Sequence, residues 1–85
     1  MRVNISNHAY DRWVDYCNYM KRSKLAALVE RHLYAALRQG VPLESEAIQL
    51  EINYKVKAVV VPGEYYGWDV VTFYLREEAK KEVIT

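Results

Sequence analysis

The sequence predicts an α+β domain of order β-α-α-β-β, with two helices packed on one face of a small antiparallel sheet. Its apolar residues recur at helical spacing over 7–38 and at a spacing of two over 48–75. Gly40 stands where the period changes. The chain has 85 residues, of which 52% are hydrophobic and 27% charged, which fits one globular domain with a modest core. We assign the domain to 1–75 and a charged C-terminal tail to 76–85.

The first element predicted is a short strand, in which Val3 and Ile5 point to the same side. A helix follows, because Ser6 or Asn7 can accept hydrogen bonds from the first free helix amides. The apolar stripe of this helix consists of Ala9, Trp13, Tyr16, Cys17 and Met20.

The second helix gives the clearest signal in the chain. Ser23 is its candidate N-cap, and Gly40 can end it in the left-handed conformation. One long helix bent at Ser23 is the alternative, but "MKRSK" (20–24) lacks apolar periodicity and favours two helices. The buried face of the second helix is formed by Leu25, Leu28, Val29, His32, Leu33, Ala36 and Leu37. Within this face we expect His32 to be a core-edge histidine with a hydrogen-bond partner.

The strands follow a loop. Regular alternation over 48–60 predicts one long strand, or two with a bend, that has one wet face. Pro62 to Gly67 is a turn, and 68–75 is a last strand that is apolar on both faces and therefore central in the sheet. Alternation along this strand predicts two faces: Val70, Thr72 and Tyr74 on one, and Val71, Phe73 and Leu75 on the other.

Composition excludes several classes of function. The net charge of +1 gives no general attraction to nucleic acid, so any such binding needs a local patch. The single cysteine, Cys17, forms no internal disulfide, and no metal-type spacing of ligands is present, so we expect no metal and no cofactor. Apolar runs are too short to span a membrane, and the N-terminus lacks the apolar segment of a signal peptide, so we expect a cytoplasmic protein.

A candidate catalytic pair lies on the first helix, where His8 and Arg12 are one turn apart. A histidine exchanges protons near neutral pH, and an arginine can bind a phosphate in bidentate fashion. Metal-independent RNA cleavage needs these two roles. The alternative is a solvated helix face on which Asp11 and Asp15 balance the nearby arginines.

Two sets of basic residues are candidates for RNA binding, each with an ordinary alternative. Lys24, Arg31 and Arg38 recur every seven residues along the second helix and are either a phosphate-binding stripe or an exposed face. Lys55 and Lys57 lie on the wet face of the strand region. If Thr72 and Tyr74 face the same side of the sheet as these lysines, they form with them a basic and aromatic surface that can bind RNA. Otherwise these lysines protect the sheet from aggregation.

A second class of function is a non-enzymatic interaction module, most simply a homodimer. The chain contains eight tyrosines, and aromatic side chains are typical anchors of protein interfaces. The candidate interface residues are Tyr65, Tyr66, Trp68 and Tyr74.

The motifs "HAYDR" and "DVVTFYL" resemble those of a group of small uncharacterised bacterial and phage domains. Their first helix opens with His-Ala-x-x-Arg, and their last strand has a Val-Val-Thr core. That group is similar to RelE-like toxins and the wider barnase, EndoU and colicin-type ribonuclease fold. The resemblance implies a metal-independent ribonuclease site at His8, Arg12 and Thr72, with RNA as substrate and an antitoxin-like protein as partner. The charged pair that usually continues the helix is replaced by "WVDYCNY", so Asp11 or Asp15 would have to replace its glutamate.

Overall fold

The computed structural model describes residues 2–40, 47–64 and 67–77. These residues form two helices and four strands, which confirms the α+β fold class. In chain order the elements are β1 (Arg2–Ile5), α1 (Asn7–Tyr16), α2 (Arg22–Arg38), β2 (Ile48–Glu51), β3 (Val56–Pro62) and β4 (Gly67–Leu75).

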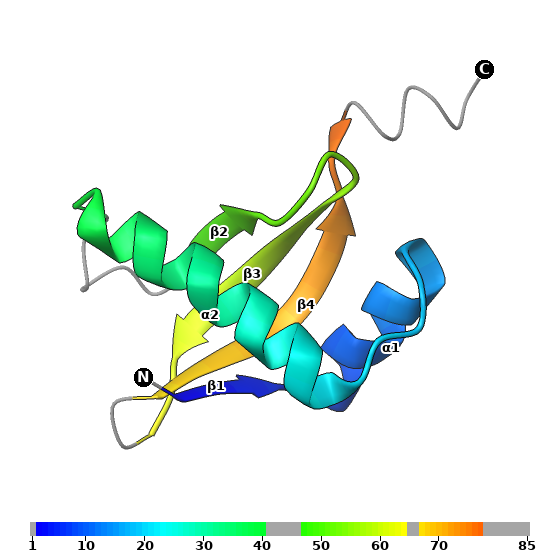
Figure 1. Ribbon diagram of the computed structural model, residues 1–85, viewed down its shortest axis with the longest axis horizontal. Coiled ribbons are helices and arrows are strands. Elements are labelled where there is room, and N and C mark those ends of the chain that lie inside the picture. Colours follow the sequence, from blue (N-terminus) through cyan, green and yellow to red (C-terminus); the bar gives the residue numbers. More distant parts are fainter. Residues whose placement is uncertain (1, 41–46, 65–66, 78–85) are drawn as a thin grey trace.

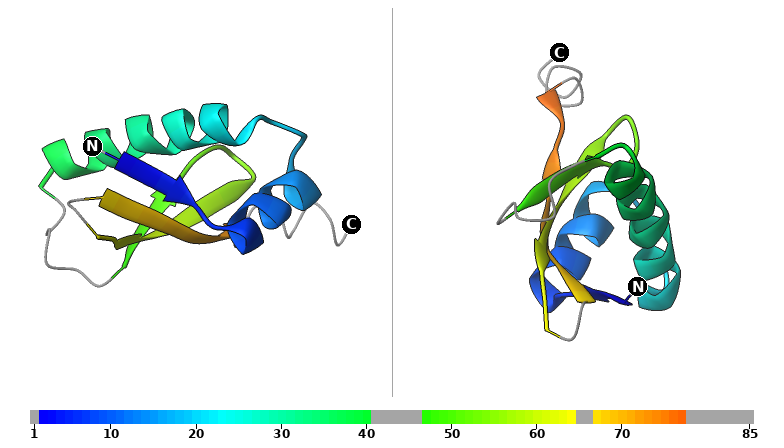
Figure 2. Two further views of the ribbon diagram at one scale, coloured as in Figure 1. Left: turned by 90° about the horizontal axis from the view of Figure 1, so that it is seen from below. Right: turned by 90° about the vertical axis from the view of Figure 1, so that its left-hand side faces the viewer.

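The four strands form one sheet in the order β1-β4-β3-β2 (Figure 1). β4 lies between β1 and β3, as its apolar character on both faces predicted. The sheet is mixed rather than wholly antiparallel, because β1 pairs with β4 in parallel while the other two pairs are antiparallel. α2 lies along one side of the sheet, and α1 lies beside the C-terminal half of β4, past the end of β1 (Figures 1 and 2).

The core lies between the sheet and the helices. α2 contributes three fully buried side chains, and alternate residues of β2 and β3 face it. We call the opposite side of the sheet the outer face. Its members in the two central strands include Lys57, Val59, Thr72 and Tyr74. The buried apolar core consists of Ile5, Ala9, Trp13, Leu25, Val29, Leu33, Ile48, Leu50, Ile52, Val56, Ala58, Val60, Trp68, Val70 and Phe73.

The two helices are separate, but only one begins as expected. Ser6 is the N-cap of α1, and its Oγ accepts a hydrogen bond from the backbone N–H of Ala9 at 3.0 Å. The expectation that Ser23 caps α2 is wrong, because the N-cap is Lys21, two residues earlier, and it makes no side-chain hydrogen bond. Gly40 has φ +92°, the left-handed conformation expected after the helix.

The alternating stretch 48–60 is two strands that fold back on each other. Asn53 makes the reversal, because its Oδ1 accepts hydrogen bonds from the backbone N–H groups of Lys55 at 2.8 Å and Val56 at 2.9 Å. The hairpin is also tied to the end of β4. Arg76, assigned to the tail from the sequence, donates its backbone N–H to Lys55 O and a guanidinium N–H to Asn53 O, each at 2.8 Å.

β4 contains a β-bulge that corrects the predicted division of its faces. Val60 pairs with Val70 and Val59 pairs with Thr72, so Val71 is an extra residue without a partner on β3. Val70 and Phe73 are therefore both fully buried in the core, whereas regular alternation placed them on opposite faces. Thr72 and Tyr74 share the outer face as predicted.

In the described part of the chain, neither helix has the length and apolar character needed to cross a membrane. The same residues contain no group of three or more His, Cys, Asp or Glu side chains suited to a metal ion.

We expect Asn53→Ala to lower the free energy of unfolding by about 1–2 kcal/mol, because two backbone N–H groups of the hairpin turn lose their acceptor. Denaturant titration followed by circular dichroism measures the change. Asn53→Asp keeps a side-chain oxygen and should cost less. Tyr54→Ala is the matched control, since this neighbouring side chain is 71% exposed. Equal stability of wild type and Asn53→Ala would contradict this account of the turn.

Candidate functional site

The start of α1 is attached to β4 by Ser6. Its backbone N–H donates to Val70 O at 3.1 Å, which continues the parallel ladder by one residue beyond β1. Its Oγ donates to Val71 O at 3.3 Å while accepting from Ala9 N–H. One residue therefore ends the strand, caps the helix and joins both to the bulge. This attachment fixes where the first turn of α1 lies relative to β4.

The packing of α1 completes this arrangement. Ala9 is fully buried, and Trp13 is 4% exposed and contacts Phe73 with ring centroids 5.4 Å apart and a tilt of 57°. The indole Nε1 of Trp13 is buried without a hydrogen-bond partner among the described residues. Because Ala9 and Trp13 face the core, the side of the helix that includes His8 and Arg12 faces away from it.

His8 and Thr72, which are 64 residues apart in the chain, form a hydrogen bond in the structure. The distance from His8 Nε2 to Thr72 Oγ1 is 3.1 Å. Thr72 is the one buried polar residue in the described part of the chain, at 9% exposure, whereas His8 is exposed. The bulge is essential to this contact, because it turns Thr72 out of the core face and toward α1.

The hydrogen bonds of Thr72 indicate which ring nitrogen of His8 acts as the donor. Thr72 Oγ1 also donates to Phe73 O at 3.4 Å. A threonine hydroxyl has one proton, so both bonds form together only when His8 Nε2–H is the donor and Thr72 Oγ1 the acceptor. In the neutral ring Nδ1 then has a free lone pair and can accept a proton.

Arg12 lies one turn beyond His8 on the exposed side of α1. Asp11 and Asp15 are exposed like Arg12, as the alternative of a solvated charged face expects, and among the described residues neither carboxylate lies within ion-pair distance of Arg12. Arg22 is engaged elsewhere. It donates to Asn7 Oδ1 at 2.8 Å and lies 4.9 Å from the ring centre of Tyr10. The guanidinium of Arg12 is therefore available to a ligand.

Further residues of the candidate site lie on the outer face of the sheet, on the side of Thr72 away from α1. Tyr74 is 51% exposed and directly opposite Lys57 in the β3–β4 ladder. Thr72 and Tyr74 thus lie on the same side of the sheet as Lys57, the condition under which the sequence predicted a basic and aromatic surface. Lys55 lies in the hairpin turn, two residues before Lys57.

The basic stripe of α2 lies elsewhere. Lys24, Arg31 and Arg38 are exposed, and the guanidinium of Arg38 lies 6.0 Å from the ring centre of Tyr34. Since α2 packs on the core side, the sheet separates this stripe from the outer face (Figure 2). His32, on the same helix, is partly buried and donates Nδ1–H to Leu28 O at 2.9 Å, as expected for a core-edge histidine.

The candidate interface residues differ in how much surface they offer. Tyr74 is half exposed, but Trp68 is buried at 8% exposure and offers little surface to a partner. Tyr65 and Tyr66 lie outside the described residues.

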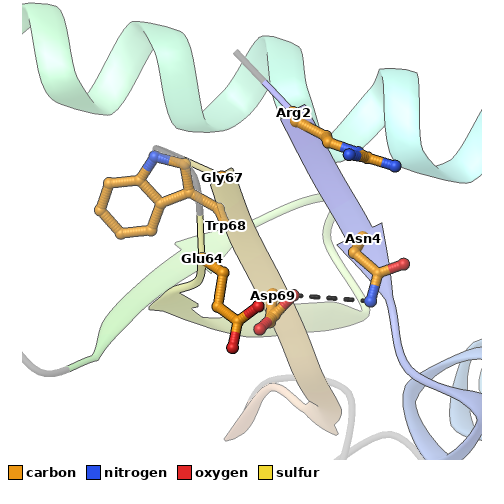
Figure 3. A pocket seen from close by; sticks show the side chains of 6 residues that line it. All are labelled: Arg2, Asn4, Glu64, Gly67, Trp68 and Asp69. Atoms are coloured by element: carbon orange, nitrogen blue, oxygen red, sulfur yellow. Dashed lines mark hydrogen bonds between the residues drawn. The ribbon is translucent and has the colours of Figure 1, made fainter.

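A hollow of about 380 Å³, which the sequence did not indicate, lies where β1 and the start of β4 run side by side (Figure 3). Asn4 Nδ2 donates to Asp69 Oδ1 at 3.5 Å across the two strands. The Asp69 carboxylate also lies against Gly63, where an added Cβ would come within 2.9 Å of it. Two carboxylates, those of Glu64 and Asp69, thus lie in the hollow at this end of β4. The hollow is lined by Arg2, Asn4, Glu64, Gly67, Trp68 and Asp69.

Comparisons of the chain with protein-family models, with curated proteins and with solved structures find no match.

A double-mutant cycle tests the His8–Thr72 hydrogen bond. We expect His8→Ala and Thr72→Val each to lower the free energy of unfolding, and the double variant to cost less than their sum by about 0.5–1.5 kcal/mol, the contribution of one hydrogen bond. Denaturant titration of the four proteins measures the coupling. Thr72→Ser keeps the hydroxyl and should preserve it. Strictly additive costs would show that the two side chains are not bonded in solution.

Proposed function

We propose that this protein binds RNA and cleaves it without a metal ion, in the manner of toxin-type ribonucleases. The proposal is supported chiefly by the hydrogen bond between His8 and Thr72, because it orients an exposed imidazole through Nε2, while Nδ1 has no hydrogen bond to another described residue. Arg12, which has no ion pair with another described residue, lies one helical turn away, and Lys57 and Tyr74 lie on the adjoining outer face.

The chemistry proposed is an in-line transfer within the RNA. His8 Nδ1 takes the proton of a ribose 2′-hydroxyl, the 2′ oxygen bonds to the adjacent phosphorus, and the bond from phosphorus to the 5′ oxygen breaks. The 5′ oxygen takes a proton from water, and the hydroxide left behind takes the proton from His8 Nδ1, which returns the imidazole to its neutral form. The products are a 2′,3′-cyclic phosphate and a 5′-hydroxyl. Arg12 binds the phosphate oxygens and stabilises the charge that develops on them. Thr72 acts as a positioning residue, because it holds the His8 ring and touches no substrate.

A second candidate function is a homodimeric interaction module. Apolar groups reach the surface of β4, where Val71 is 38% and Tyr74 is 51% exposed, and the neighbouring Val59 and Val61 of β3 are half buried. Apolar side chains surrounded by polar ones are typical of interface centres. This candidate uses the outer face without requiring any chemistry from His8.

The ribonuclease proposal predicts that the purified protein cleaves RNA in the presence of EDTA. His8→Gln should lower the rate by about 10²- to 10⁴-fold, because glutamine can still donate to Thr72 but cannot accept and release a proton at neutral pH. Gel electrophoresis of a labelled RNA measures the rate. Arg12→Ala should reduce it as well.

His32→Gln is the matched control, since the other histidine of the chain lies on α2 and takes no part in the proposed site. Its activity should equal that of the wild type. Absence of cleavage by the folded wild type, or full activity of His8→Gln, would refute the ribonuclease proposal.

The dimer candidate predicts a concentration-dependent dimer in sedimentation experiments. Val71→Lys should shift it to monomer, because a charge is then placed at the apolar centre of the outer face. Tyr34→Lys, on α2 and 57% exposed, should leave it unchanged. A wild type that remains monomeric at every concentration would exclude this candidate.

A further inference from the structure

Tyr74 occupies a particular place in the proposed site. It lies on β4 between β3, where Lys57 is directly opposite, and α1, which provides His8 and Arg12. Half of its side chain surface is accessible, at 51%. An exposed aromatic ring is therefore flanked by cationic or protonatable groups on both sides.

The charges on the outer face favour phosphates at this end of the sheet. Glu51 lies opposite Lys57 on β2, but its carboxylate forms an ion pair of 3.4 Å with Arg76. The two carboxylates of the hollow, Glu64 and Asp69, belong to the other end of β4. Val61, which pairs with Asp69, is four residues from Lys57, about 13 Å along the strand. Asp11 and Asp15 lie on α1 with Arg12, but among the described residues neither forms an ion pair with it. Lys57 and Arg12 thus attract phosphates, and the carboxylates at the far end repel them.

This arrangement matches one nucleotide with its two neighbouring phosphates. A strand that crosses β4 from α1 to β3 would have one phosphate at Arg12 and His8 and the next at Lys57. The base between them then lies over the Tyr74 ring. Aromatic side chains stack on bases of every type, so the contact is tolerant of sequence.

We infer that the substrate is single-stranded RNA and that Tyr74 is its base-stacking residue. The inference rests on the proposed function and deepens it. A base inside a duplex is already stacked and paired, and its face is not accessible to a side chain on a flat sheet. Double-stranded RNA is therefore excluded as a substrate, and unpaired segments are selected.

The test measures binding with a probe that cannot be cleaved. A fluorescent 2′-O-methyl RNA of about eight nucleotides, within the usual site size of single-strand binders, lacks the 2′-hydroxyl nucleophile. Anisotropy titrations compare this strand with the same strand annealed to its complement. We expect the single strand to bind at least tenfold more tightly.

Substitutions of Tyr74 separate stacking from other effects. Tyr74→Ala should weaken binding by about 5- to 150-fold, the range that loss of one stacked base gives. Tyr74→Leu keeps an apolar side chain and should weaken it nearly as much, whereas Tyr74→Phe keeps the ring and should stay within about threefold. Tyr19→Ala is the control for an exposed tyrosine outside the site, because Tyr19 is 75% exposed between the helices.

The outcomes distinguish this inference from the proposed function. Binding that depends on the Tyr74 ring, together with absence of RNA cleavage, would support the inference and refute the ribonuclease chemistry. Equal binding of single strand and duplex, unchanged binding by folded Tyr74→Ala and Tyr74→Leu, or no binding by the wild type would overturn the inference.

Discussion

The geometry of the molecule depends on the connection between β1 and α1 at Ser6. This residue adds the last backbone bond to the parallel β1–β4 pair, caps α1 and donates its hydroxyl to the carbonyl of Val71. A helix joined to a strand by a free loop could pack over β4 in several orientations. Here the first turn has one position, and the buried contact of Trp13 with Phe73 holds the rest of the helix. The position of His8 beside Thr72 is a consequence of these two attachments.

The two faces of the sheet differ in what covers them and in the residues they carry. α2 covers the core side with a continuous apolar face and presents its basic residues to solvent on the far side. Among the described residues no helix covers the outer face, and its polar and aromatic residues lie next to the exposed side of α1. The candidate site therefore lies on the face of the sheet opposite α2. There the backbone of β4 is held by β3 on one side and by β1 and the start of α1 on the other. The bonds of Arg76 to the hairpin turn and to Glu51 add rigidity at the same end of the sheet.

Local patterns in the sequence predicted the helices, the left-handed Gly40 and the central place of β4, because each depends on neighbours in the chain. The parallel pairing of β1 with β4 joins segments about 65 residues apart and has no local signature. Periodicity could not reveal the bulge, since apolar residues occur on both predicted faces of this strand and no alternation is visibly broken at Val71. His8 and Thr72 were joined only through the resemblance of two short motifs, and no spacing rule relates positions 64 residues apart. The hollow at Asp69 had no signal in the sequence beyond scattered polar residues.

The bulge at Val71 also determines which deletions would shorten β4 without turning its core residues to the solvent. Before the bulge Trp68 and Val70 face the core, and after it Phe73 and Leu75 do. The bulge therefore shifts the alternation of faces by one residue. Deletion of Val71 would give a regular ladder with every other side chain on its present face, at the loss of one acceptor for Ser6. Deletion of Phe73 or Tyr74 would instead turn Leu75 to the solvent. Among the positions from Val71 to Tyr74, only Val71 and Thr72 can be deleted without reversing the faces of the strand, and only deletion of Val71 keeps the hydroxyl that bonds His8.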